Sequence, residues 1–375
     1  MQETLLGGLS ARAFLRRHWQ KRPLLVRGAL PGFTGVLDPP ALFALASRND
    51  VESRLVRRRK DRWEVREGPL PRATLARAGA RDWTLLVNGV DHHCAAAARL
   101  LRRFAFVSES RLDDVMVSYA APGGGVGPHV DSYDVFLIQA HGRRRWRLAR
   151  PRPFALVPGA PLKLIADFRT EEEMVLEPGD LLYLPPGWGH DGVALDECVT
   201  CSVGMRAPQG DELSAAFLDY LHERGLPAAG YRDPGLAPAG HPGRIDRGIL
   251  AHAARQLARI RWTRRDVEDF LGRHLSSPRP HTVFPSRRMP PPGRLARSTV
   301  VLDPKTRMLY RGGRVFLNGE SWAPGAAALR ALAALADHRS APGSALARAG
   351  LRRRIYEWYC AGALDLRRGK GADLE

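Results

Sequence analysis

The first hundred residues alternate between helical and extended spacing of apolar side chains. Phe14 and Trp19 belong to a helical pattern that Pro23 interrupts, and the apolar run 24–26 then predicts an extended segment. Alanine, leucine and polar ends predict further short helices, and a β-branched and aromatic run predicts a strand. The expected helices cover 42–50, 70–79 and 94–104, and the expected strand lies within 83–91.

Between residues 113 and 206 the spacing becomes that of strands. Short β-rich runs are separated by clusters of Gly and Pro such as 121–128 and 184–189. Evenly spaced strands without intervening helices predict a closed or sandwiched antiparallel barrel. The expected strands are 113–120, 133–140, 144–149, 172–177, 180–185 and 199–206.

After Pro208 the pattern becomes helical again. A helix is expected over 211–225, because it starts with acidic residues and ends at glycine, and a second amphipathic helical stretch over 247–275. The final part combines strand-like runs with helical patterns at 325–337 and 345–362, which is compatible with a winged-helix fold.

These changes of spacing divide the chain into four parts. We expect a barrel domain over 1–208, a helical region over 209–280, a Pro-rich linker over 281–297 and a C-terminal domain over 298–375. The last ten residues, 366–375, are expected to form a mobile tail. The predicted fold class is therefore mixed α and β.

Composition excludes several classes of protein. No run of about 18 apolar residues is present, so we expect no membrane span. The first residues lack the apolar core of a secretory signal, and four cysteines are too few for a disulfide scaffold. Cys198 and Cys201 are spaced so that a strand would turn them to opposite faces. We expect a cytoplasmic protein.

The chain carries a formal net charge of +19, almost all from arginine. A basic protein is attracted to phosphate-rich partners, and ribosomal RNA or a ribosomal particle would fit. Alternatively, arginine replaces lysine across a solvated surface in a chain rich in Ala, Arg, Gly and Pro. Both interpretations stay open, because charge alone indicates no activity.

Three residues form a candidate metal site. His129 and Asp131 are two positions apart and would share one face of a strand, and His190 could join them from a neighbouring strand. Two histidines and one carboxylate on one face, with the other positions open, are the facial triad of non-haem Fe(II) oxygenases. Each histidine alone would more often be a surface or core residue, but Gly-rich and Pro-Gly turns precede both blocks.

Two blocks of sequence carry a family resemblance. PGGGVGPHVDSYDVFLIQAHGRRRWRL at 122–148 and EPGDLLYLPPGWGHDGVAL at 177–195 resemble the two halves of the barrel in Jumonji-type, cupin-like 2-oxoglutarate oxygenases. More narrowly, they and the F-L-x-x-x-W-x-x-x-P segment at 14–23 resemble bacterial ribosomal oxygenases, which hydroxylate an arginine of a large-subunit ribosomal protein.

The resemblance implies a double-stranded β-helix, a helical dimerisation region and a winged-helix-like C-terminal domain. It implies that His129, Asp131 and His190 hold Fe(II), and that 2-oxoglutarate and O2 are cosubstrates. The expected products are a hydroxylated arginine of a 50S ribosomal protein, succinate and CO2. The expected partners are that ribosomal protein and a second copy of the chain, with ribosomal RNA as the partner that the net charge suggests and no membrane.

Arg144 is the candidate for binding the distal carboxylate of 2-oxoglutarate. Strand alternation puts Arg144 on the same face as Trp146, and an arginine fork binds a carboxylate with two parallel hydrogen bonds. The alternative is a solvated basic strand, but by resemblance Arg144 is the family's matching position. Ser118 is expected to donate a hydroxyl to the same ligand. Tyr133 and Trp188 are expected to border the barrel mouth and contact substrate.

Three other functions remain as alternatives. The chain could hydroxylate a histidine instead of an arginine, because related oxygenases do so with the same metal motif. It could be a metal cupin acting on a small molecule without 2-oxoglutarate. It could also be a basic nucleic-acid-binding protein whose barrel is inactive.

Overall fold

The structure is a computed structural model that describes residues 5–60, 62–280, 282–291 and 293–368. It divides into two compact units, and each is described by itself. The first unit is the chain up to Ala207 together with the segments Pro280–Pro285 and Asp303–Lys305, and the second is the rest. None of the described helices is both long and apolar enough to cross a membrane.

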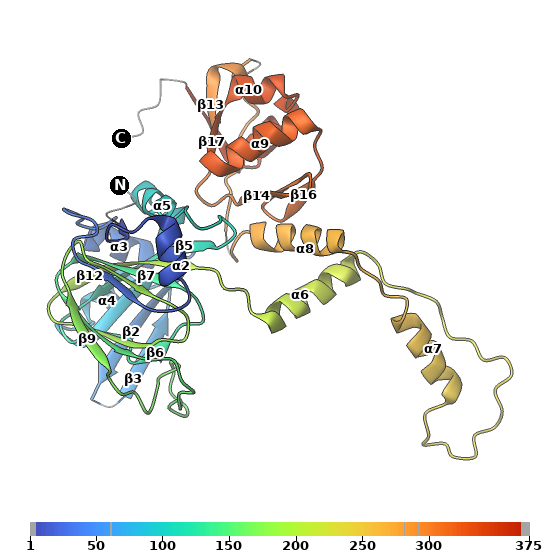
Figure 1. The fold of residues 1–375 in the computed structure, drawn as a ribbon, viewed down its shortest axis with the longest axis horizontal. Coiled ribbons are helices and arrows are strands. Elements are labelled where there is room, and N and C mark those ends of the chain that lie inside the picture. The colour runs from blue at the N-terminus through green and yellow to red at the C-terminus, as the bar shows by residue number, and fades with distance from the viewer. Residues whose placement is uncertain (1–4, 61, 281, 292, 369–375) are drawn as a thin grey trace. The chain divides into compact units, whose positions relative to one another are not determined.

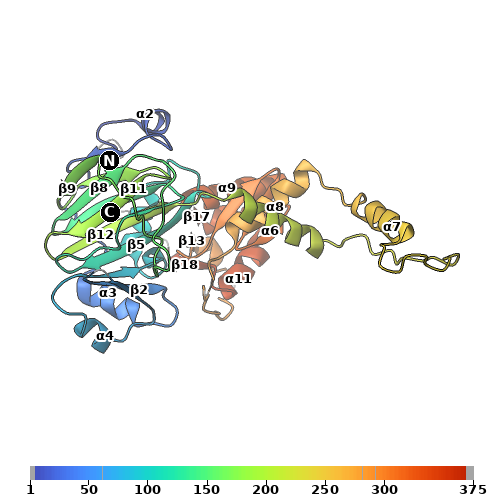
Figure 2. The same cartoon turned by 90° about the horizontal axis from the view of Figure 1, so that it is seen from below.

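The first unit contains two antiparallel sheets that form the predicted barrel (Figures 1 and 2). The larger sheet has the order β1 (Leu24–Val26), β10 (Leu181–Leu184), β7 (Val135–His141), β12 (Cys198–Met205), β5 (Leu112–Ala120), β4 (Trp83–Val87), β2 (Ser53–Arg59), β3 (Arg62–Glu67). The smaller sheet has the order β6 (His129–Val130), β11 (Gly189–Ala194), β8 (Arg144–Ala149), β9 (Glu172–Leu176).

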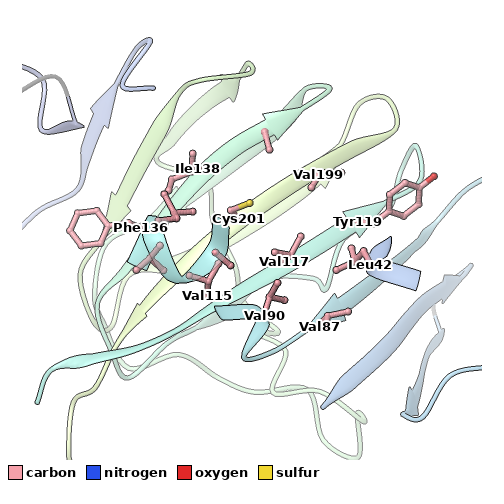
Figure 3. Close-up of a cluster of buried hydrophobic side chains, with 14 of the residues drawn as sticks. Leu42, Val87, Val90, Val115, Val117, Tyr119, Phe136, Ile138, Val199 and Cys201 are labelled. Atoms are coloured by element: carbon pink, nitrogen blue, oxygen red, sulfur yellow. The ribbon is translucent and has the colours of Figure 1, made fainter. Parts of the chain in front are cut away.

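The larger sheet buries one face against helices. Odd positions of β5 and even positions of β7 project into one cluster that includes Val115, Val117, Phe136 and Ile138, as Figure 3 shows. Burying each such side chain contributes about 1.5–3 kcal/mol. The helices of this unit are α2 (Ala11–Arg17), α3 (Pro39–Ala46), α4 (Arg72–Ala76) and α5 (Ala95–Arg102), with the 3-10 turn η1 (Val90–His92).

The other face of the larger sheet looks into the barrel. A second apolar cluster lies between the sheets, formed by Leu137 and Leu182 from the larger sheet and Trp146 and Leu148 from the smaller. This alternation is what a strand period of two requires when both faces are covered. Cys198 and Cys201 lie in different buried clusters, as their spacing predicts.

The helices predicted over 42–50, 70–79 and 94–104 and all the predicted barrel strands are present, but one hairpin was missed. β2 and β3 pair along six residues at the edge of the larger sheet. Trp63 and Val65 alternate with charged residues in β3, so the signal for a half-exposed strand was there. The density of arginine in this segment conceals that alternation.

The second unit begins with α6 (Gly210–Glu223), as predicted. The helical stretch expected over 247–275 is instead two helices, α7 (Arg247–Leu257) and α8 (Arg264–Ser276). The break has a local cause, because the Thr263 side chain caps the backbone N–H of Asp266 and Asp266 reciprocates in a capping box. α8 packs on the small sheet β14 (Met308–Arg311), β15 (Arg314–Leu317), β16 (Glu320–Trp322).

The C-terminal part is built around its own core. It contains η2 (Leu295–Arg297), β13 (Ser298–Leu302), α9 (Ala326–His338), β17 (Ser340–Pro342), α10 (Gly343–Arg348), α11 (Arg352–Cys360) and β18 (Leu364–Arg368). The expected helix over 345–362 is two helices separated at Gly350, whose φ is +78°. The tail predicted from 366 is corrected, because 366–368 pair with β13; residues 369–375 lie outside the described part.

Candidate metal centre

The structure brings His129, Asp131 and His190 together. β6 and β11 are paired so that His129 lies directly opposite His190, and their ring centroids are 4.2 Å apart. Asp131 follows the end of the two-residue strand β6. Its carboxylate oxygens lie 3.9 Å from His129 Nε2 and 3.6 Å from His190 Nε2. One ligand atom from each residue lies within 4.8 Å of the others.

Backbone carbonyls orient both imidazoles. His129 Nδ1 is 2.8 Å from the carbonyl oxygen of Gly127, and His190 Nδ1 is 3.0 Å from that of Trp188. A carbonyl oxygen only accepts hydrogen bonds, so each Nδ1 carries the proton. In the neutral imidazole this leaves the lone pair on Nε2, the nitrogen nearer Asp131, which is the tautomer that a metal ligand needs.

Two glycines let bulky side chains approach the histidine strands. A Cβ on Gly127 would lie 2.6 Å from Leu164 and 2.9 Å from Trp63, and one on Gly189 would lie 2.9 Å from Phe154. Gly127 also has a φ of +78°, which disfavours other residues. Apolar side chains from the β8–β9 loop and from β3 thus form an apolar wall against the backbone next to the two histidines. Sequence reasoning missed this wall because it missed β3.

The site keeps His190 neutral. Burial of the ring, and next the nearby His129, lower the pKa of His190 to about 4. A neutral imidazole is the form that binds metal. Two imidazole nitrogens and one carboxylate are the ligand set that non-haem Fe(II) sites use.

Arg144 is a buried cation whose charge is not matched by a carboxylate. It is 4% exposed, and its Nη1 donates to Ser118 Oγ at 3.1 Å and Thr200 Oγ1 at 3.2 Å. Its Nε is buried without a partner, and among the described residues no carboxylate lies within ion-pair distance. Thr200 in turn donates to Gln139 Oε1 at 3.0 Å. Because an unpaired buried charge is costly, this cradle suits an anionic ligand.

Trp146 connects the arginine to the histidines. Its ring centroid lies 5.4 Å from Arg144 Cζ and 5.9 Å from the ring of His190. Its indole N–H is buried and has no partner in the described part of the chain. A Cβ on Gly192 would lie only 2.7 Å from the indole, so glycine makes room for the ring. The pocket therefore contains two buried donors without acceptors, Arg144 Nε and Trp146 Nε1.

The two residues expected at the barrel mouth, Tyr133 and Trp188, differ in exposure. Tyr133 follows Asp131 and is 40% exposed. Trp188 is only 8% exposed and packs in the apolar cluster between the sheets, and its contact with substrate stays a prediction. What Trp188 offers the site is its backbone carbonyl, which accepts from His190.

Asp134 anchors the turn that carries Asp131, and sequence reasoning missed it. Its side chain is fully buried and accepts a 2.6 Å hydrogen bond from the Tyr183 hydroxyl and one of 3.0 Å from Gln20 Nε2. Burial and this bond to Asp134 raise the pKa of Tyr183 above its usual value. Its partners lie 49 and 114 residues away, a separation that no local pattern reports.

Two known families match separate parts of the chain. Residues 99–213 match the family described as JmjC domain, and residues 259–365 match the family described as ROXA-like winged helix. The first match contains all three candidate ligands, and the second confirms the predicted winged-helix fold.

Individual relatives match at higher identity. The chain is 42% identical over 230 residues to the ribosomal protein uL16 3-hydroxylase of Escherichia coli strain K12, covering 61% of each chain. It is 37% identical over 199 residues to a probable ribosomal oxygenase of Haemophilus influenzae, covering 52% of this chain and 49% of that one. These alignments span less than two thirds of either relative.

A solved structure extends the similarity to nearly the whole chain. The structure of YcfD, a ribosomal oxygenase from Escherichia coli, in complex with cobalt and 2-oxoglutarate has a TM-score of 0.79 and 32% sequence identity. The alignment covers 96% of this chain and 98% of that one.

Proposed function

The chain belongs to the bacterial ribosomal oxygenases, and we propose that it is an Fe(II)- and 2-oxoglutarate-dependent hydroxylase of an arginine in ribosomal protein uL16. One observation carries the proposal: three convergent metal-ligand atoms lie beside a buried arginine that lacks a carboxylate partner. The E. coli uL16 3-hydroxylase and the 2-oxoglutarate complex of YcfD support the choice of substrate and cosubstrate.

The described residues supply ligands for the metal and a donor for the cosubstrate. His129, Asp131 and His190 would hold Fe(II), and Arg144 would bind the distal carboxylate of 2-oxoglutarate. Arg144 lies opposite Ala194, four residues from His190 on β11, which is about 13 Å along the strand. The arginine side chain and an extended dicarboxylate together span that separation. Ser118 and Thr200 hold the guanidinium in place for it.

When bound, Fe(II) and 2-oxoglutarate supply the oxidation, in which one atom of O2 converts the cosubstrate to succinate and CO2 and the other enters a substrate C–H bond. The chain's own residues supply orientation. The carbonyls of Gly127 and Trp188 fix the imidazoles. Leu164, Trp63 and Phe154 pack against the glycines that flank the histidines and so support the strands that carry them.

Local charge favours a cationic substrate although the whole chain is basic. Residues 150–200 contain nine Asp or Glu against four Lys or Arg. The loop that starts this segment packs through Phe154 and Leu164 against the glycines next to the two histidines. A basic loop of a ribosomal protein would meet carboxylates there, and Tyr133 is placed to contact the entering side chain. The enzyme would act in the cytoplasm, where ribosomal proteins are made.

We also propose that the chain is a homodimer through α6–α8. All of α7 is described and none of its residues is buried, yet it carries Ile249, Leu250 and Leu257 at 48%, 63% and 68% exposure. Among the described residues, Tyr231 contacts this helix through the His252 ring and the N-cap Asp246, and these apolar side chains stay exposed. Exposed apolar side chains gathered on one helix are typical of an interface. A second copy is the occupant that the family resemblance favours.

The test is turnover of uL16 by the purified protein. Recombinant uL16 is incubated with Fe(II), 2-oxoglutarate and air, and its mass is followed while succinate is measured. One added oxygen located on an arginine, with equimolar succinate, is the expected result. Oxygen on a histidine would contradict the choice of residue. Absence of any 2-oxoglutarate turnover would favour a barrel that is inactive or acts on another molecule.

A further inference from the structure

The C-terminal part of the chain is strongly basic. Residues 286–368 contain 16 Lys or Arg and only five Asp or Glu, which is the opposite of the balance over 150–200. Most of this excess does not serve the core, which is formed by aliphatic side chains and Trp358. Part of it is concentrated at one feature of the fold, the connection between α10 and α11.

α10 and α11 form a helix-turn-helix. Only residues 349–351 separate them, and the turn is closed by hydrogen bonds from Gly350 N to Ala347 O and from Leu351 N to Leu346 O, both 3.1 Å. This is a Schellman ending, which requires the positive φ of Gly350. Helix pairs joined by three or four residues containing Gly are typical of nucleic-acid-binding domains, in which the start of the second helix meets the ligand.

Three exposed arginines lie across this turn. Arg348 ends α10, and Arg352 and Arg353 start α11. Neither Arg348 nor Arg352 forms an ion pair with another described residue, and the Arg353 side chain is 90% exposed even where it meets Glu357. Cations in the first turn oppose the helix dipole, so they do not serve the stability of α11. A role in binding explains them better than a role in folding.

We propose that the arginines of this turn, Arg348, Arg352 and Arg353, bind the phosphate backbone of duplex RNA. In α11, which is described throughout, only Arg352 and Arg353 are exposed, so the helix cannot lie along a major groove and read bases. It can present its first turn to phosphates, which is the contact that a narrow-grooved A-form helix allows. The choice of RNA over DNA rests on the proposed action on a ribosomal protein.

The experiment compares three forms of the full chain. The test variant is R348Q/R352Q/R353Q. The control is R66Q/R72Q/R99Q, which removes the same charge from exposed arginines of the first unit. Each is titrated with a mixed-sequence RNA duplex of about 16 base pairs and with the corresponding DNA duplex, over a range of salt. Thermal unfolding and hydroxylation of free uL16 are measured in parallel.

The wild type should bind duplex RNA with a Kd of about 1–100 μM at physiological salt. The test variant should bind at least about tenfold more weakly, with a log–log salt slope shallower by about 2–3, while the control keeps the wild-type Kd. All three should keep the same Tm and hydroxylate uL16 equally. An equal loss in the control, tighter binding of DNA, or an unchanged Kd in the test variant would overturn the proposal. Loss of hydroxylation in the wild type itself would count against the proposed function alone.

Discussion

The barrel and the α6–α8 segment differ in how much of their apolar side chains they bury. In the barrel, Phe136, Leu182 and Tyr183 are fully enclosed by the chain itself. In the helical segment, Leu218, Leu250, Leu257 and Trp262 are each more than half exposed, and α7 buries nothing. The barrel is therefore complete as a single chain, whereas the helical segment needs another surface. The comparison predicts that site variants act on chemistry and α7 variants act on assembly.

The largest effect is expected from Asp131→Ala. It removes the only carboxylate among the three candidate metal ligands, so hydroxylation of uL16 should fall to background while the fold persists. Glu67→Ala removes an exposed carboxylate from β3, outside the acidic segment 150–200, and should leave the rate unchanged. The rate is measured by mass spectrometry of uL16. Full activity in Asp131→Ala would end the metal assignment.

Arg144→Met should raise the KM for 2-oxoglutarate more than it changes any other kinetic constant. Losing a charge-assisted contact of about 1.5–3 kcal/mol corresponds to a KM for 2-oxoglutarate raised by roughly 10- to 150-fold. Arg145→Met is the matched control, because Arg145 lies on the opposite face of β8. If the KM rises equally in both variants, the cation that binds the cosubstrate lies elsewhere.

Replacing both Leu250 and Leu257 with aspartate should disrupt the dimer without removing any residue of the metal centre. Placing charges on the exposed face of α7 should convert the dimer to a monomer at micromolar concentration, as read by light scattering. Leu195→Asp, a similar change at a 39% exposed leucine of the barrel unit, should leave the dimer intact. A wild-type chain that is already monomeric would contradict the contrast between the two regions.

His190 should make the metal-free protein sensitive to acid. Its folded pKa of about 4 lies below its ordinary value of 6.5, so the unfolded chain takes up a proton in that window and the folded chain does not. The free energy of unfolding should therefore fall as the pH drops from 6.5 towards 4, by on the order of 3 kcal/mol. In His190→Asn, the free energy of unfolding measured with urea should not show this part of the fall with pH. An identical pH dependence in both proteins would refute it.

The smallest effect is expected from Gly192→Ala. The new methyl group would meet the Trp146 indole at 2.7 Å, so the ring must shift, which costs about 1–3 kcal/mol. The Tm should fall, and the KM for 2-oxoglutarate should rise because Trp146 lies beside Arg144. Gly243→Ala, where the new Cβ would meet nothing within 4 Å, is the control. An unchanged Tm in Gly192→Ala would show that the Trp146 ring can shift without cost, contrary to this account.

The parts of the site that could be predicted are those encoded locally. His129 and Asp131 are two residues apart, and Arg144 and Trp146 alternate on one strand, so period-two reasoning grouped each pair correctly. His190 was expected on a neighbouring strand after a Pro-Gly turn, and the role proposed for Arg144 came from the family resemblance. The wall around the histidines could not be predicted, because Trp63 reaches Gly127 through a strand pairing that the arginine-rich sequence of β2–β3 obscures.

The fold shows the same limit. Strands of the barrel core were found from their apolar alternation, whereas the two breaks at Thr263 and Gly350 were missed because apolar periodicity continues across them. Both breaks depend on cap hydrogen bonds instead. Asp134 could not be recognised at all, because its burial follows from Tyr183 and Gln20 meeting it from distant segments.

The central claim is that three ligands and one arginine form a single pocket for a metal and 2-oxoglutarate. Calorimetric titration of 2-oxoglutarate under anaerobic conditions, with and without Fe(II), tests it most directly. The wild type should bind 2-oxoglutarate tightly only with the metal, Arg144→Met should keep the metal but lose most of the cosubstrate affinity, and Asp131→Ala should lose both. Equal binding of 2-oxoglutarate with and without metal, or unchanged affinity in Arg144→Met, would contradict the account.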